Sequence, residues 1–297
     1  ISFSDNMGIK ATGSVIFRGP GSLAISVEGD TMDGISVGGD ATMQNTTVSV
    51  QAPAGIGVGC DGSLILDNAQ LTSNGLYAGI DAANLVAKNG CTVNISATEQ
   101  HCNAAYIDPR DGSAGNINIS NSTVTAKSLY PGLYATGNMT IDGGTVQATS
   151  TDDSPLWAKN NITIKGKAKV TLSGAYPSGC NGNFTVYEAE IDAKNTSQNN
   201  IPALADCPTI NDDFALTYAM AVDSEGTSID LIEHDGAEQA KGFLHLYKNI
   251  HFITGEKTVT YSLPFTKVVK KGGDIAPAKQ EFELEVFDVG VGQIEDY

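Results

Sequence analysis

The stretch Gly132–Thr149 reads GLYATGNMTIDGGTVQAT and decides the fold of the chain. It contains three short runs in which apolar and polar residues alternate, separated by a Gly-Asn step and an Asp-Gly step. Alternation with a period of two is typical of β-strands that bury one face, and sharp turns favour Gly, Asn and Asp. We therefore interpret this stretch as one unit of three strands and two corners.

Related units recur about every 22 residues, as expected of a repeat protein. The middle strand of each unit recurs at Val15–Phe17, Ala41–Met43, Leu64–Leu66, Leu85–Ala87, Ile117–Ile119, Met139–Ile141, Ile162–Ile164 and Phe184–Val186. Two residues after seven of the eight strands stands a residue type that tolerates a positive φ angle, namely Gly19, Asn45, Asn68, Asn89, Asn121, Gly143 and Gly166. A second polar series directly precedes the strands, at Ser14, Asp40, Ser63, Asn84, Asn116, Asn138, Asn161 and Asn183.

The third strand of each unit carries an apolar residue in register, namely Leu23, Val48, Leu71, Val93, Val124, Val146, Val170 and Ile191. Three short strands and two corners per repeat are typical of a coil of a parallel β-helix, whose rungs stack about 4.8 Å apart. The sequence therefore predicts an all-β fold, a right-handed parallel β-helix of about eight rungs over residues 1–200. Apolar columns are expected to face its interior.

Charge and composition narrow the possible partners. The net charge of −17 and the scarcity of arginine disfavour nucleic acid, which requires a basic surface. No apolar run is long enough to span a bilayer, so direct membrane insertion is not expected. The chain begins at Ile1 and is expected to be a processed piece. The five cysteines are expected to be free thiols, with a Cys91–Cys102 or Cys180–Cys207 disulfide as the alternative.

Rungs such as GNMTIDGGTV, residues 137–146, resemble the pectate-lyase-like β-helix proteins on the surface of clostridia and related Gram-positive gut bacteria. Some of those proteins are described as carbohydrate-binding. The resemblance covers residues 1–200. It implies an extracellular, cell-surface-attached adhesin whose partner is a polysaccharide, a host glycan or a host surface protein.

The repeat fades after residue 200. Residues 201–262 are expected to form a capping segment or a small β subdomain, because the last rung of a β-helix must be covered. Residues 263–297 resemble the opening of the isopeptide-linked β-sandwich domains of Gram-positive pilins. That resemblance implies a bond-forming Lys267 assisted by Glu283 or Glu285. Since the sequence ends before a matching asparagine strand, we expect a partial domain without the bond.

When the repeat units are aligned with one another, one outward position in the first strand is aromatic in four consecutive rungs. These residues are Tyr77, Tyr106, Tyr134 and Trp157. Apolar residues flank these aromatics, so a period of two directs their rings outward. Rings spaced about 4.8 Å apart nearly match the advance of a polysaccharide per sugar unit and can stack on sugar C–H faces. The alternative is that the rings stack on one another for stability, or that a loop covers them.

A long loop within residues 96–113 follows the first of these aromatics and brings charged residues to the same side. Asp108 and Arg110 are candidate ligand-binding residues beside the aromatic positions. Asp108, Asp111, Asp152 and Asp153 together are a candidate Ca²⁺ site, since clustered carboxylates are the ligands that calcium prefers. These aspartates are equally ordinary turn formers. No other cofactor is expected.

Three functions remain open from the sequence. The leading hypothesis is a non-catalytic adhesin or glycan-binding stalk. The second is a divergent polysaccharide lyase or glycoside hydrolase that acts on a pectin-like polymer through Arg110 and the aspartates of the candidate calcium site. Against it, the four histidines are scattered and the candidate region holds one arginine. The third is a purely structural surface spacer.

Overall fold

The computed structural model describes residues 2–4, 7–29, 32–222, 225–257, 270–271 and 274–275. Contacts divide the chain into two units, Ile1–Lys257 and Thr258–Tyr297. In the second unit, β26 (Lys270–Lys271) and β27 (Asp274–Ile275) pair as antiparallel strands. The predicted isopeptide residues Lys267, Glu283 and Glu285 lie outside the described residues.

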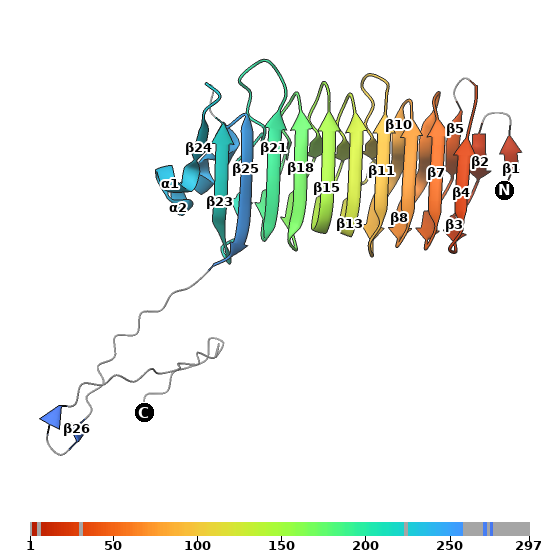
Figure 1. The fold of residues 1–297 in the computed structure, drawn as a ribbon. Coiled ribbons are helices and arrows are strands. Elements are labelled where there is room, and N and C mark those ends of the chain that lie inside the picture. The colour runs from red at the N-terminus through yellow and green to blue at the C-terminus, as the bar shows by residue number, and fades with distance from the viewer. Residues whose placement is uncertain are drawn as a thin grey trace. The chain divides into compact units, whose positions relative to one another are not determined.

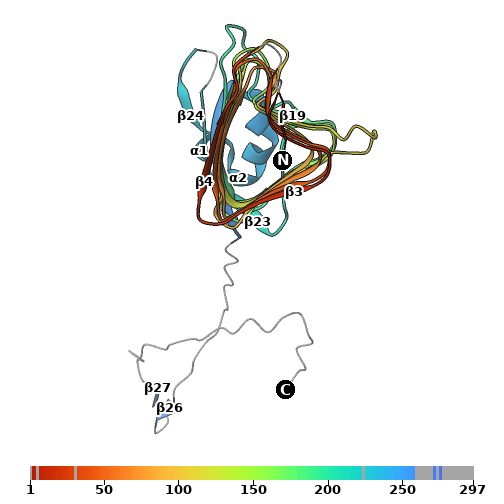
Figure 2. The ribbon, with the colours of Figure 1, turned by 90° about the vertical axis from the view of Figure 1, so that its right-hand side faces the viewer.

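The first unit is a parallel β-helix of about nine turns, which confirms the predicted fold class. Its strands stack side by side along one axis (Figure 1). Seen along that axis, the turns superimpose into a three-sided outline (Figure 2). The turn beyond the predicted eight is built after residue 200, where Leu204 bridges Ser178 and the short β22 (Thr209–Ile210) pairs in parallel with β20 (Phe184–Val186).

Each side of the outline is a parallel sheet. The first sheet contains β2 (Met7–Ala11), β5 (Asp33–Val37), the starts of β8 (Ile56–Asp67) and β10 (Ala78–Lys88), β12 (Ala105–Ile107), β14 (Leu133–Ala135), β16 (Leu156–Ala158) and β19 (Gly179–Cys180). The second contains β3 (Val15–Arg18), β6 (Ala41–Gln44), the ends of β8 and β10, the starts of β13 (Ile117–Ser128) and β15 (Met139–Ser150), β17 (Ile162–Lys165), β20 and β22. The third contains β4 (Ser22–Ser26), β7 (Thr47–Ala52), β9 (Gln70–Gly75), β11 (Thr92–Ala97), the ends of β13 and β15, β18 (Ala168–Gly174) and β21 (Ala189–Asn195).

The corner between the second and third sheets confirms the prediction of positive φ angles. All seven predicted Gly and Asn residues adopt them: Gly19 120°, Asn45 50°, Asn68 48°, Asn89 59°, Asn121 45°, Gly143 73° and Gly166 67°. Neighbouring corners are also joined, since Asn68 Nδ2 donates to Asn45 Oδ1 over 2.8 Å. The repeat thus selects Gly and Asn for backbone geometry and for stacking.

The second polar series forms a ladder along the corner between the first and second sheets. Asn138 N donates to Asn116 Oδ1 over 2.9 Å, and Asn183 N donates to Asn161 Oδ1 over 2.8 Å. Asn161 in turn donates to Asn138 Oδ1 from both its backbone and its side chain. Each side-chain oxygen therefore satisfies a backbone N–H of the next rung, where the strands bend.

Replacing Asn161 by alanine is expected to lower the free energy of unfolding by about 1 kcal/mol, because Asn183 loses the acceptor for its N–H. The matched control is Asn160→Ala, which removes the neighbouring exposed side chain and is expected to cost less than about 0.5 kcal/mol. Urea unfolding followed by circular dichroism measures both. Equal losses in the two variants would contradict the ladder's contribution.

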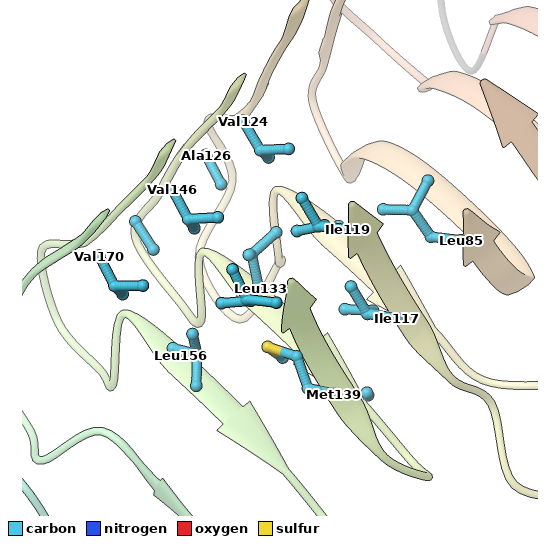
Figure 3. Packing of buried hydrophobic residues seen from close by; sticks show 14 of the residues in the cluster. Leu85, Ile117, Ile119, Val124, Ala126, Leu133, Met139, Val146, Leu156 and Val170 are labelled. Atoms are coloured by element: carbon cyan, nitrogen blue, oxygen red, sulfur yellow. The ribbon is translucent and has the colours of Figure 1, made fainter. Parts of the chain in front are cut away.

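The core is a set of apolar columns that run along the axis. The predicted column from Leu23 to Ile191 is present in full register. Val124, Val146 and Val170 follow one another within it and point into the interior (Figure 3). Burying such a side chain contributes about 1.5–3 kcal/mol relative to leaving it exposed. Stability is therefore distributed along the coil, and each rung depends on its neighbours.

Additional strands pair with the coil at both of its ends. At the N-terminal end, β1 (Ser2–Ser4) pairs antiparallel with β2. At the other end, β25 (Asn249–Glu256) pairs antiparallel with β21, and β23 (Phe214–Val222) and β24 (Ser228–Asp230) extend that sheet. The helices α1 (Leu231–Asp235), α2 (Ala237–Ala240) and η1 (Lys241–Leu246) lie across the same end of the coil (Figures 1 and 2).

Fully buried Leu231 and Leu244 anchor these helices to the core. The domain boundaries at residues 200 and 262 stay predictions.

All five cysteines are free thiols, as expected. Among the residues that the structure describes, no helix has the length and apolar character needed to cross a membrane.

Candidate functional site

Three of the predicted aromatics form a row across the first sheet. Tyr106, Tyr134 and Trp157 are the central residues of β12, β14 and β16, and they pair in register. The residues on either side of each aromatic are buried, which leaves the three rings on the outer face and partly exposed. The rings of Tyr106 and Tyr134 stack, with centroids 5.4 Å apart and planes 8° from parallel.

Tyr77 does not belong to this row, so the predicted alignment was wrong at that rung. The residue in register with Tyr106 is Asp81. The chain bends at Leu76 and Tyr77 before β10 begins, and the Tyr77 N–H donates to Gly55 O over 3.3 Å. The corner therefore takes up residues that the alignment assigned to the strand. Tyr77 is 45% exposed and lies beside the row instead.

The row lines a pocket of about 430 Å³, which we call the aromatic pocket. Its walls are Asn103, Tyr106, Tyr130, Pro131, Tyr134, Asp153, Ser154 and Trp157. Tyr130 was not predicted as a site residue; it lies in the loop before β14, and its ring meets the ring of His101 edge-on at 4.9 Å. The long loop thus contributes a wall through Asn103 and leaves a hollow over the three rings.

A smaller pocket of about 180 Å³ adjoins it, which we call the side pocket. It is lined by Ile56, Tyr77, Ala78, Asp81, His101, Cys102, Asn103 and Tyr106. Asn103 and Tyr106 line both pockets, so the two form one continuous surface. Tyr77 reaches this surface from the side pocket.

Asp108 is tied to the row through Tyr106. The Tyr106 hydroxyl donates to Asp108 Oδ2 over 2.8 Å. Burial, followed by this hydrogen bond to Asp108, raises the pKa of Tyr106 to about 12. The phenol therefore stays protonated at neutral pH and holds its donor position, which fixes the orientation of the first ring in the row.

Arg110 and Asp111 lie in a different place. Arg110 Nε pairs with Asp61 Oδ1 at 3.0 Å, and both side chains are more than half exposed. A third pocket of about 360 Å³ is lined by Asp61, Ala83, Asn84, Pro109, Arg110, Asp111 and Ser113. It shares no residue with the aromatic pocket or the side pocket. Arg110 therefore lines a different pocket from the aromatics, although its charge still acts on Asp81 of the side pocket. Its role in ligand binding stays a prediction.

The four candidate calcium ligands are not brought together. Within residues 7–29, 32–222 and 225–257, no group of three or more His, Cys, Asp or Glu side chains is arranged to hold a metal ion. Asp111 Oδ1 accepts from the N–H of Ser113 and closes a turn. Asp153 lines the aromatic pocket, Asp108 holds Tyr106, and Asp152 is exposed. The predicted joint site was wrong because these aspartates serve separate local structures.

The predicted catalytic group, Arg110 with the four aspartates of the candidate calcium site, is also divided between different parts of the surface. Arg110 and Asp111 lie in the third pocket, Asp108 binds Tyr106, and Asp153 lines the aromatic pocket. Asp152 is exposed and lines none of the three pockets. Three of the histidines, His234, His245 and His251, lie on α1, η1 and β25 at the C-terminal end of the coil. A general acid and base must both reach the reacting bond, and Arg110 and Asp111 line a different pocket from Asp153.

Comparison with known proteins assigns the chain to a family. The search of curated proteins and the search of solved structures returned no match. The sequence model of a family described as carbohydrate-binding domain-containing protein matches residues 4–175, which is more than half of the chain. The matched region includes Tyr106, Tyr134 and Trp157. The chain therefore belongs to the carbohydrate-binding domain-containing family.

Proposed function

We propose that the protein binds a carbohydrate chain in the aromatic pocket and does not cleave it. The observation that supports this most directly is the row of Tyr106, Tyr134 and Trp157 in register on adjacent strands beneath a pocket. Adjacent strands lie about 4.8 Å apart. A sugar chain that runs along the helix axis can therefore advance by about one sugar unit for each aromatic of the row.

The pocket supplies both kinds of contact that a sugar requires. The three aromatic side chains offer apolar surface for sugar C–H groups, apart from the faces that Tyr106 and Tyr134 turn toward each other in their stack. Asn103, Asp153 and Ser154 offer hydrogen-bonding groups at the edge of the same pocket. A few polar groups around an apolar floor are the usual composition of a small-molecule site, because the apolar floor supplies affinity and the polar groups fix orientation.

The wider biological role is part of this proposal. We propose a non-catalytic adhesin or glycan-binding stalk, extracellular and attached to the surface of a Gram-positive bacterium, with a polysaccharide, host glycan or host surface protein as partner. A β-helix supports such a role because its distributed core presents the aromatic row on a rigid sheet. Ca²⁺-dependent release of unsaturated or reducing sugars from pectin by the purified protein would contradict the non-catalytic part.

The binding proposal predicts that Trp157→Ala and Tyr134→Ala each weaken glycan binding by about 10-fold to 100-fold, since covering a large apolar side chain contributes roughly 1.5–3 kcal/mol. A glycan microarray identifies the ligand, and calorimetric titration of the positive glycan measures the loss. The control is Tyr218→Ala, which removes a 38% exposed tyrosine of β23. Unchanged binding in both pocket variants, with folding verified by circular dichroism, would contradict the proposal.

A further inference from the structure

The surface formed by the aromatic pocket and the side pocket carries negative charge in both parts. Asp153 lines the aromatic pocket and Asp81 lines the side pocket. Between them, Asp108 accepts a hydrogen bond from the hydroxyl of Tyr106, which lines both pockets. A ligand that extends over both pockets therefore meets carboxylates along its length.

Few cations balance these carboxylates. Arg110 is ion-paired with Asp61, and Lys159 Nζ lies 5.9 Å from the centre of the Tyr134 ring. In the described part of the chain, neither Asp81 nor Asp153 forms an ion pair. Asp153 Oδ1 accepts only the neutral N–H of the adjacent Ser154, over 2.6 Å. A positive charge on a ligand would meet two carboxylates that form no ion pair with the protein.

The surroundings of Asp81 disfavour its negative charge. Burial raises the pKa of Asp81, the nearby Arg110 opposes that rise, and the carboxylates of Asp33, Asp108 and Asp61 add to it. A carboxylate whose charge is disfavoured in this way gains more from a nearby cation than a solvated one does. A bound ammonium would lower the pKa of Asp81 toward its ordinary value.

Asn103 lies at the junction of the two pockets. Its side chain is 7% exposed and lines both pockets. Within the described residues, its Oδ1 accepts no hydrogen bond. This oxygen has almost no accessible surface, so a ligand would contact other atoms of Asn103.

We propose that the ligand is a linear chain of amino sugars with free, protonated amines, which lies across both pockets with its ammonium groups toward Asp81 and Asp153. This inference rests on the proposed carbohydrate-binding function and names its ligand class. From the Asp81 position to the Trp157 position there are three strand spacings, about 14 Å in total. The same carboxylates disfavour a chain of uronic acids by like-charge repulsion.

Three tetrasaccharides with one backbone test this ligand class. They are β-1,4-linked glucosamine, β-1,4-linked N-acetylglucosamine and cellotetraose, which differ only in the substituent at carbon 2. Calorimetric titration of the full chain, in a buffer in which the sugar amine is protonated, is expected to give about tenfold or more tighter binding of the glucosamine tetramer than of the other two. Asp81→Asn and Asp153→Asn are each expected to reduce that preference.

The control variant is Asp152→Asn, which removes an exposed carboxylate next to Asp153 that lines neither pocket, and the preference should persist in it. Equal affinity for the three tetramers, a preference for a neutral one, or binding of none of them would overturn the ligand class. If cellotetraose binds equally well and Trp157→Ala abolishes that binding, the proposed function stands and only the ligand class fails. A preference for the glucosamine tetramer that persists in both Asp81→Asn and Asp153→Asn would also overturn the proposed ligand class.

Discussion

Replacing Gly144 by valine is expected to destabilise the β-helix by about 3–5 kcal/mol, the sum of a strained backbone and a steric conflict. Gly144 lies in β15 with a φ of 76°, a conformation that a β-branched residue rarely adopts. A Cβ atom at this position would lie 2.2 Å from Ser122 O and 2.5 Å from Ser122 N, both backbone atoms of the rung below. The rungs that contain Gly144 and Ser122 would have to move apart to remove this steric conflict.

The control for this variant is Gly112→Val. Gly112 has a similar φ of 80°, but a Cβ atom there meets no atom within 4 Å. The control therefore carries the conformational cost alone, about 1–3 kcal/mol. Urea unfolding of both variants, followed by circular dichroism, separates the two costs. Equal destabilisation would show that close approach of the rungs at Gly144 contributes nothing.

The second large effect is expected from Leu133→Ala, with a loss of about 2–5 kcal/mol. Leu133 is fully buried in β14 and pairs in register with Leu156 on one side and with Ala105 on the other (Figure 3). Its strand neighbours are fixed by hydrogen bonds to adjacent rungs, so the cavity left by the truncation cannot close easily.

Leu246→Ala is the control for the core variant, because Leu246 is 55% exposed at the end of η1. Its truncation is expected to change the free energy of unfolding by less than about 0.5 kcal/mol. The comparison by thermal and urea unfolding measures what burial in the coil contributes. A loss in the Leu133 variant no larger than that in the control would contradict the assignment of Leu133 to the core.

The corners of the fold could be predicted from the sequence because seven of the eight predicted corners need a positive φ angle at the same position. The same few residue types therefore recur there from rung to rung. A position with a positive φ accepts few residue types, so Asn121 and Gly143 mark equivalent corners although their side chains differ. The core column was predictable for a similar reason. Val124 and Val146 occupy the same register position on adjacent rungs, and both face the interior.

The site was only partly predictable. The period placed Tyr134 and Trp157 in one row, and the structure agrees. Tyr77 was misplaced because the number of residues in a corner changes from rung to rung and the alignment assumed a constant number. Tyr130 and Asn103 lie in loops outside the repeat, where no periodic signal exists. Which loop residues complete a pocket depends on packing that the repeat does not specify.

The fluorescence of Trp157 tests carbohydrate binding at the aromatic row most directly. Trp157 is the single tryptophan of the chain, so its emission reports on the aromatic pocket without interference from other tryptophans. Titration of the unmodified protein with each glycan retained on the microarray is expected to change that emission in a saturable way, with the same affinity as calorimetry gives. Saturable binding by calorimetry with unchanged Trp157 emission would contradict binding at the row.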